Sequence, residues 1–438
     1  MQKRRNAAKK QLRIALVSDF FCPNTGGVET HLYHLGGCLL KKGHHVIVLT
    51  HVYGDRKGII YLSNGLKVYH IPFFPPKSMY ILPSVWGSCY FYREILKLER
   101  IDIIHGHSAF SPMAHEAMLH GWCMGLNTVF TDHSLFGFSD ISAILINRLL
   151  LRYSLPNIDR SICVSRICKE NIVLRGGLDR DKVSVIPNAI DASRFLPADR
   201  PKAGPLTIII VSRLVYRKGA DLLVKVIPRI CQLHPDIRII IGGDGPKRVD
   251  LEEMREIYSL EDRVEMRGML PHNKVRDVLI EGDIFLNCSL TEAFCVAIVE
   301  AASCGLHVVS TAVGGVPEVL PPEYITLAKP DIDDIVQALS SAIEKKKRNE
   351  FLDRHTLHKQ IKQMYRWEDV AKRTEKVYTQ TISEDKVRIG ERLKRYFRHD
   401  SVFGMVWLFV VTINILICRF LDLMDNLKTT NRKKKKRK

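Results

Sequence analysis

Short apolar runs rich in β-branched residues alternate with helix-length stretches along most of this chain. Alternation of this kind is typical of βαβ units around a mainly parallel sheet. The sequence therefore predicts an α/β fold with doubly wound sheets. The predicted strands are residues 14–18, 45–50, 67–71, 101–105, 128–132, 161–165, 183–187, 206–212, 237–241, 263–267, 284–287 and 307–311.

A short segment interrupts this alternation near the middle of the chain. Residues 196–205 hold three prolines and one glycine in ten positions, a composition that favours a hinge-like linker. We therefore predict two Rossmann-like domains, at residues 11–195 and 206–383. Open α/β sheets bind ligands at the carboxyl ends of their strands, so two such domains are expected to face a common cleft.

An apolar run near the carboxyl terminus differs from the rest of the chain. Residues 402–418 are 17 positions without a formal charge, which is the lower limit for crossing a bilayer, and Thr412 and Asn414 weaken the case. The alternative is a buried core helix, but aromatic residues within the run and basic clusters on both sides favour a membrane segment. We predict a basic juxtamembrane segment at 384–401, a membrane segment at 402–421 and a basic tail at 422–438.

The net charge of +19 does not indicate a nucleic-acid partner. Much of it lies in two tails, because residues 1–13 carry six basic residues and residues 432–438 carry seven. No zinc-finger spacing and no basic helix with interleaved aromatics is present, which argues against nucleic-acid binding. The eleven cysteines include no Cys-x-x-Cys pair and predict free thiols in a reducing compartment, so the body is expected to be cytoplasmic.

Two adjacent glycines follow the first predicted strand and open a helix. Gly26 and Gly27 would let backbone amides approach a ligand closely, and a helix amino terminus favours an anion. Strand-to-helix glycines are more often plain turns. Their spacing differs from Gly-x-Gly-x-x-Gly, which disfavours a nicotinamide cofactor.

Two basic residues follow the first strand of the second predicted domain. Arg213 and Lys218 are five positions apart, in a loop expected at the carboxyl end of that strand. A forked guanidinium together with an ammonium group suits a diphosphate, which one cation could not neutralise. A solvated basic loop is the alternative, but the glycine-rich turn at 242–246 should bring bare backbone to the same edge of the sheet.

Two carboxylates eight positions apart form the most specific pattern. Glu292 lies in the loop after the predicted strand at 284–287, and Glu300 would project from the second turn of a helix that begins near Val296. One carboxylate could accept hydroxyls of a sugar and the other those of a ribose, while the helix amides hold phosphates. Paired carboxylates are usually surface charges. A further glycine turn at 311–318 favours the binding site.

These residues resemble the motifs of a known enzyme family. Residues 292–300 resemble the E-x7-E motif of the retaining family-4 glycosyltransferases, which have the GT-B fold, and four further motifs lie in the family's order, namely GGVETH, SRLVYRKG, GGDGP and GGVPE. This resemblance covers about residues 12–383. The runs at 105–117, 131–140 and 186–195 are similar to the family of phosphatidylinositol N-acetylglucosaminyltransferase A subunits, the catalytic subunits of the complexes that begin the synthesis of GPI anchors.

The resemblance implies a retaining transfer of N-acetylglucosamine from UDP-GlcNAc to phosphatidylinositol. In that family Arg213 and Lys218 would hold the diphosphate, Glu300 the ribose and Glu292 the sugar hydroxyls. Gly26 and Gly27 would close over the donor from the first domain. Two alternatives stay open: a family-4 enzyme with another lipid or sugar acceptor, and an inactive GT-B membrane scaffold, although a scaffold should have lost at least one of the four charged residues.

The resemblance also assigns His133 to the transferred sugar as a catalytic residue beside Glu292. A lone histidine is more often a packed or solvated residue. Cys295 and His307 stand where many relatives have glycine and proline. No Asp-x-Asp cluster ends a predicted strand, so we expect no metal and no cofactor.

The implied partners are the other subunits of the transferase complex and the endoplasmic reticulum membrane. We expect a single span, which would place the tail in the lumen, because the nucleotide-sugar donor that the resemblance implies is cytoplasmic; the alternative is a shallow or re-entrant segment that would leave both ends cytoplasmic. Six basic residues precede the segment and nine follow it, and the chain ends in a dilysine-like sequence, so charge alone does not decide. Protease protection of a tag after Lys438 distinguishes the two. The aromatic stretch 71–86 is expected to face the membrane or to pack as a loop.

Overall fold

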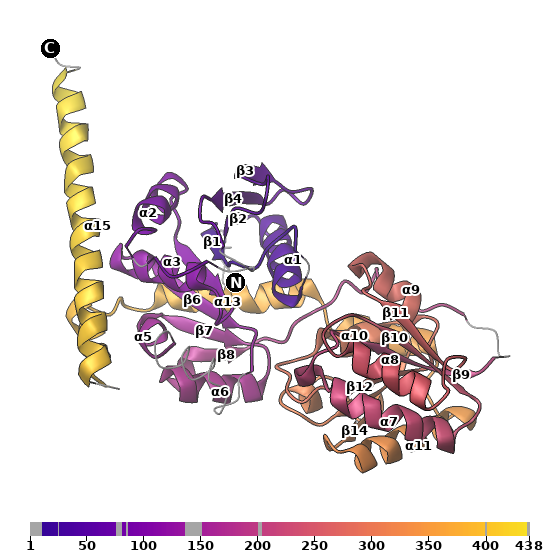
Figure 1. The fold of residues 1–438 in the computed structure, drawn as a ribbon. Coiled ribbons are helices and arrows are strands. Elements are labelled where there is room, and N and C mark those ends of the chain that lie inside the picture. Colours follow the sequence, from indigo (N-terminus) through magenta and orange to yellow (C-terminus); the bar gives the residue numbers. More distant parts are fainter. Residues whose placement is uncertain are drawn as a thin grey trace, which may run out of the picture.

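The computed structural model of the chain describes residues 11–435, apart from 25, 76–80, 85, 136–150, 200–203 and 399–400. Part of the predicted linker and the end of the 131–140 run therefore lie outside the described residues. Figure 1 shows two lobes side by side, with one long helix standing along the outer edge of the first lobe. Each lobe is built around one sheet, as predicted.

The first sheet has eight strands in the order β3-β4-β2-β1-β5-β6-β7-β8, and β3 alone is antiparallel to its neighbour. The seven strands predicted for this domain are confirmed. The eighth, β3, is a four-residue edge strand that was not predicted, and its residues Gly58, Ile59 and Tyr61 are exposed although the run is apolar. The bounds are β1 Arg13–Val17, β2 His45–His51, β3 Gly58–Tyr61, β4 Lys67–Ile71, β5 Ile103–His107, β6 Asn127–Asp132, β7 Arg160–Cys163 and β8 Val183–Val185.

Side-chain caps fix where several helices of the first lobe begin. The Ser111 hydroxyl accepts from the backbone N–H of Ala114 at the start of α3, where Pro112 fits the first turn. Ser165 caps α6 in the same way, so this helix begins directly after β7. The helices here are α1 Gly27–Lys41, α2 Cys89–Leu98, α3 Pro112–Cys123, α5 Arg152–Ser154 and α6 Arg166–Gly176.

The second sheet has six parallel strands in the order β11-β10-β9-β12-β13-β14. The five predicted strands are confirmed, and β14 adds an edge. Its strands are β9 Leu206–Val211, β10 Ile237–Gly242, β11 Val264–Gly268, β12 Ile284–Asn287, β13 His307–Thr311 and β14 Ile325–Ala328. Its helices are α7 Ala220–Leu233, α8 Arg248–Ile257, α9 Val275–Leu279, α10 Val296–Ser303, α11 Ile332–Lys347 and α12 Arg354–Met364.

The chain then returns to the first domain. Helix α13 (Trp367–Ser383) packs against α1 and β6, and Figure 1 shows it crossing beneath the first sheet. Its Tyr378 hydroxyl lies 2.7 Å from Nδ1 of His105 in the middle of β5. Helix α13, which the predicted bounds 206–383 include in the second domain, thus packs on the first sheet and α1.

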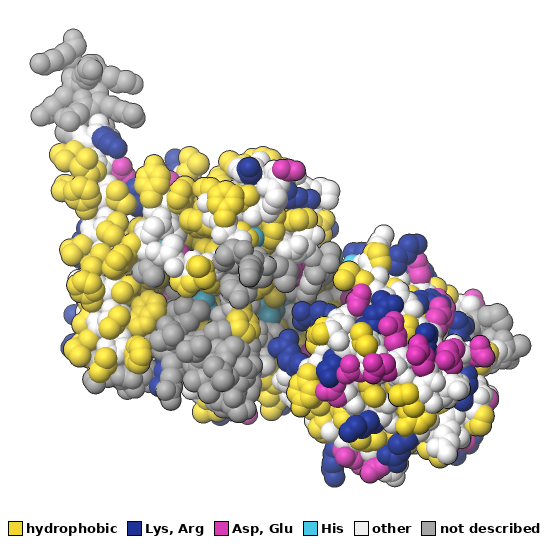
Figure 2. All heavy atoms as spheres, in the orientation of Figure 1, with side chains coloured by type: hydrophobic (Ala, Val, Ile, Leu, Met, Phe, Trp, Pro, Cys, Tyr) yellow, Lys and Arg dark blue, Asp and Glu magenta, His cyan; other side chains and the backbone are white. Residues whose placement is uncertain are grey.

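Helix α15 (Ser401–Lys435) follows the short helix α14 (Ile389–Lys394) and contains the predicted membrane segment. Residues 402–428 are long and apolar enough to cross a membrane by length and composition. One side of α15 packs on the first domain, where Val411 and Ile415 join a small core with Trp122 of α3. Figure 2 shows hydrophobic side chains running along α15 and continuing over the adjoining part of the first domain.

Polar contacts join α15 to α2 and α3. Asp422 and Asp425 each lie 2.6 Å from Arg93, whose side chain is only 1% exposed. Oδ1 of Asn414 is 2.9 Å from Nδ1 of His120, and both residues are fully buried. Only the guanidinium of the Arg93 ion pairs is buried, because the Asp422 and Asp425 side chains are 55% and 43% exposed. The sequence did not predict this docking, which fixes the orientation of α15 on the body.

A thiol pair across this contact offers a test in native membranes. The Sγ atoms of Cys89 and Cys418 are 3.8 Å apart. Mild oxidation should therefore link α2 to α15 within one chain, because sulfurs at this separation need only a small shift to bond. With a protease site inserted near residue 200, the two fragments should stay together on a non-reducing gel. Fragments that separate, as they must in Cys89→Ser, would show that α15 leaves the body in the membrane.

Candidate active site

The loops at the carboxyl ends of β9 and β12 bring two of the predicted donor-binding residues, Lys218 and Glu292, together. Lys218 lies in a helical turn after β9, and its Nζ forms an ion pair with Oε1 of Glu292 in the loop after β12. The Ser289 hydroxyl donates to the same Oε1 at 2.9 Å. The Lys218 and Glu292 side chains are 22% and 11% exposed, so solvent screens this pair less than a surface pair.

Gly219 makes this approach of the two loops possible. It has a φ of +75°, in the left-handed region, and a Cβ atom there would lie 1.8 Å from the carbonyl oxygen of Cys288. Any other residue would push the loop after β9 away from β12. The final glycine of the SRLVYRKG motif therefore has a steric role in the ion pair.

Glu300 lies on α10, apart from Glu292. Its carboxylate is 14% exposed, and Oε1 is 3.7 Å from Nε2 of His272. Helix α10 begins at Val296, as predicted, and Cys295 caps it with a φ of +65°. Glycine adopts this conformation without strain, whereas a residue with a Cβ is strained in it. The cysteine that stands where many relatives have glycine therefore costs backbone strain at this position. Burial raises the pKa of the Cys295 thiol, which therefore stays protonated.

Glu29 relates the Gly26–Gly27 turn of the first domain to Arg213 of the second through its electrostatics. Glu29, in the first turn of α1, is buried, and its Oε2 is 2.5 Å from the position of a Cβ at Gly26. Burial raises the pKa of Glu29, whereas its own backbone N–H and the Arg213 guanidinium act in the opposite direction. The exposed Arg213 of the second domain thus acts to lower the pKa of Glu29, which lies beside the glycine turn of the first domain.

The Gly314–Gly315 turn contacts both the loop after β12 and the first domain. The N–H of Gly315 donates to the carbonyl oxygen of Glu292 at 2.9 Å. A Cβ on Gly314 would lie 2.6 Å from Cδ2 of Leu135, two residues after His133, and one on Gly315 would lie 2.7 Å from Oγ of Ser165. Glycine at both positions lets this turn reach the segment that carries His133.

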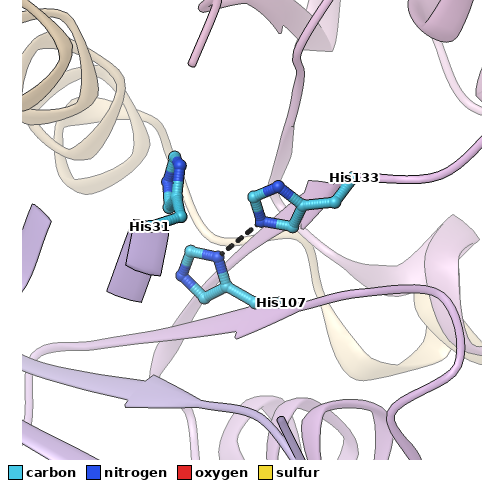
Figure 3. A group of neighbouring side chains, drawn as sticks. All are labelled: His31, His107 and His133. Atoms are coloured by element: carbon cyan, nitrogen blue, oxygen red, sulfur yellow. Dashed lines mark hydrogen bonds between the residues drawn. The ribbon is translucent and has the colours of Figure 1, made fainter. Parts of the chain in front are cut away.

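His133 follows β6 and belongs to a cluster of three imidazoles (Figure 3). Its Nε2 is 3.2 Å from Nδ1 of His107, and its ring centroid is 4.7 Å from that of His31. Burial lowers the pKa of all three, so the rings are neutral near pH 7. One ring nitrogen from each lies within 4.8 Å of the others, a spacing that could admit a metal ion.

Three residues near the site were not predicted as site residues from the sequence. They are Glu29 and His31, on α1 directly after the glycine pair, and His107, at the carboxyl end of β5. The sequence could have indicated His107, because it ends a buried parallel strand and such sheets bind ligands at the carboxyl ends of their strands.

Comparison with known proteins gives this arrangement a family. Residues 51–140 match the family described as PIGA (GPI anchor biosynthesis), and residues 194–364 match glycosyl transferases group 1. The A subunit of phosphatidylinositol N-acetylglucosaminyltransferase from Arabidopsis thaliana is 51% identical over 420 residues, or 96% of this chain and 93% of that protein. The chain belongs to the family of phosphatidylinositol N-acetylglucosaminyltransferase A subunits.

Relatives in this family come from distant organisms. The human A subunit is 50% identical over 94% of this chain and 85% of its own length, and the gpi3 subunit of Schizosaccharomyces pombe is 48% identical over 93% and 89%. The resemblance stated from the motifs is confirmed. The chain is a glycosyltransferase of GPI-anchor biosynthesis, and membership of a family of named subunits implies further subunits.

Solved structures confirm the GT-B fold of this phosphatidylinositol N-acetylglucosaminyltransferase homologue. Sucrose-phosphate synthase from Thermosynechococcus elongatus matches with a TM-score of 0.65 at 20% identity, over 85% of this chain and all of that one. The Anabaena protein HepE, in complex with UDP, matches with a TM-score of 0.66 at 17% identity, over 84% of this chain and all of that one. At these identities the likeness establishes the fold alone.

Proposed function

We propose that this chain is the catalytic subunit that transfers N-acetylglucosamine from UDP-GlcNAc to an inositol hydroxyl of phosphatidylinositol, with retention of anomeric configuration. The observation that carries the proposal is the Lys218–Glu292 ion pair at the edge of the second sheet. Family membership indicates the reaction class. The pair places a cation, Lys218, where the motifs predict the diphosphate and a carboxylate, Glu292, where they predict the sugar.

In this mechanism the ion pair prepares the site for the donor. Without a ligand, Lys218 and Glu292 neutralise each other. An arriving diphosphate offers Lys218 a stronger anion, and Glu292 then becomes free to accept sugar hydroxyls. Arg213 and the amides at the start of α10 add positive potential where charge develops on the leaving UDP. The inositol oxygen would bond to C1 of the sugar on the face from which UDP leaves, and its proton would pass to the departing diphosphate oxygen, so the proposed step uses no carboxylate nucleophile from the first domain.

The membrane position follows from the acceptor. Two apolar side chains of the segment after β4, Phe74 and Leu82, are 71% and 65% exposed, although Ile81 between them is buried. A surface of this kind could rest on the bilayer and bring the lipid headgroup to the cleft. We place the body on the cytoplasmic face of the endoplasmic reticulum, where closure of the two domains would exclude water from the donor.

The purified complex that contains this chain should make N-acetylglucosaminyl-phosphatidylinositol in the presence of excess chelator. The cations of the site are Lys218 and Arg213, so no divalent ion is needed to stabilise UDP. Radiolabelled UDP-GlcNAc should enter a lipid that a phosphatidylinositol-specific phospholipase C cleaves, and UDP-glucose should not compete at equal concentration. Activity that chelator removes and manganese restores would overturn metal independence, and label in another lipid would overturn the acceptor.

A further inference from the structure

The surroundings of His107 determine which of the two rings donates the hydrogen bond between His107 and His133. His107 is fully buried at the end of β5, and only its Nδ1 faces a polar partner, Nε2 of His133 at 3.2 Å. Among the described residues, Nε2 of His107 has no hydrogen-bond partner. A buried N–H without a partner is rarer in proteins than an acceptor left unsatisfied. The proton of His107 therefore belongs on Nδ1.

We propose that His107 is a positioning residue, which donates its Nδ1–H to Nε2 of His133 and so holds His133 in the tautomer that carries its proton on Nδ1. Figure 3 shows that second nitrogen of His133 on the side of the ring opposite His107. His133 then donates a hydrogen bond to an oxygen of the transferred sugar and does not accept a proton. The sugar in this statement rests on the proposed function, whereas the tautomer does not.

The rings around His107 hold it in place. The centroid of the His105 ring lies 4.0 Å from that of His107. His105 is itself fixed, because Nε2 is 2.6 Å from the Thr131 hydroxyl and Nδ1 is 2.7 Å from the Tyr378 hydroxyl. Through Tyr378 and His105, helix α13 thus helps to hold the ring of His107, which donates the hydrogen bond to His133.

The third imidazole of the cluster is held separately. Nδ1 of His31 lies 3.0 Å from Oδ1 of Asn188, and an amide oxygen can only accept, so the proton of His31 is on Nδ1. The His31 ring meets that of His133 edge to face, with 72° between the planes. Its position limits rotation of His133 without competing for Nε2.

Substitutions at His107 separate this role from packing. In His107→Asn the amide can donate from close to the position of Nδ1, whereas His107→Leu fills the space without a donor. We expect His107→Asn to keep most of the transfer rate and His107→Leu to lower kcat about tenfold to a hundredfold, with little change in KM for the donor, because a misplaced group costs rate rather than affinity.

His115→Leu is the matched control. It removes an equally buried imidazole of the first domain, which contacts the Ala109 carbonyl and the Ser154 hydroxyl outside the cluster. It should leave kcat near the wild-type value. Equal losses of kcat in folded His107→Asn and His107→Leu would overturn the positioning role.

Nitrogen-15 NMR spectra of the full chain with labelled histidines report the tautomer of His133 and do not require enzymatic activity. The resonances that disappear in His133→Ala identify His133 and should report a protonated Nδ1 and an unprotonated Nε2. A protonated Nε2, or a shift of both rings on adding Zn²⁺ with recovery of chelator-treated activity, would contradict the proposal. If the wild-type complex instead made no labelled phosphatidylinositol, the proposed function would fail while the tautomer stayed measurable.

Discussion

Replacing Lys218 by methionine is expected to lower the transfer rate by about a hundredfold to a thousandfold, the usual loss when one preorganised group that stabilises transition-state charge is removed. Methionine keeps much of the length and apolar volume of lysine, so the loop after β9 should stay folded. Two effects act together: the leaving UDP loses a cation, and Glu292 keeps a partly buried charge without its partner. Initial rates at saturating donor measure the loss.

Lys274→Met provides the control for charge alone. This lysine is 63% exposed and pairs with Asp277 within its own helical segment, so its loss removes the same formal charge away from the ion pair. Surface pairs contribute only about 0–1 kcal/mol, and the rate should stay near that of the wild type. A Lys218→Met complex as active as the Lys274→Met complex would remove Lys218 from the donor site.

The second large effect separates His133 from Glu300. His133→Ala should mainly lower kcat, because the residue is assigned to the reacting sugar, whereas Glu300→Gln should mainly raise KM for UDP-GlcNAc, because the ribose is bound equally before and during transfer. The lost hydrogen bond to the Glu300 carboxylate costs about 1.5–3 kcal/mol, which corresponds to about tenfold to a hundredfold, and the loss of the group that orients the reacting sugar at His133 costs about a hundredfold in rate. Steady-state kinetics with inhibition by UDP separate the two parameters.

Glu253→Gln, on the exposed face of α8, is the control for the change of carboxylate to amide. It should leave both parameters unchanged. An unchanged rate for folded His133→Ala would exclude that residue from the reaction. A Glu300→Gln variant with lower kcat and normal UDP inhibition would place Glu300 at the reacting centre instead of at the ribose.

Several features of the site follow from the sequence because parallel strands end at a common edge. Lys218 follows β9 and Glu292 follows β12, which are neighbours in the sheet, so their loops had to lie close together. The amino terminus of α10 was predictable from the same rule. The strands themselves were visible because most are short, apolar and buried on both faces.

Other features depend on contacts between distant segments that no local pattern encodes. The sequence shows that residues 367–383 form an apolar-faced helix, but not that this helix returns to the first sheet to bind His105. It likewise shows an apolar segment after residue 401 but not the pairing of the buried Arg93 guanidinium with Asp422. The His107–His133 contact joins two strands through a geometry that only the packed structure defines.

The central claim is that this chain catalyses the transfer of N-acetylglucosamine to phosphatidylinositol. Membranes from cells that lack their own catalytic subunit, supplied either with this chain or with its Lys218→Met form at equal amount, should be given radiolabelled UDP-GlcNAc. The wild-type chain should restore label in a lipid that phosphatidylinositol-specific phospholipase C cleaves, and the variant should restore about one per cent or less. Equal labelling by both chains, or none by the wild type in an assembled complex, would contradict the claim.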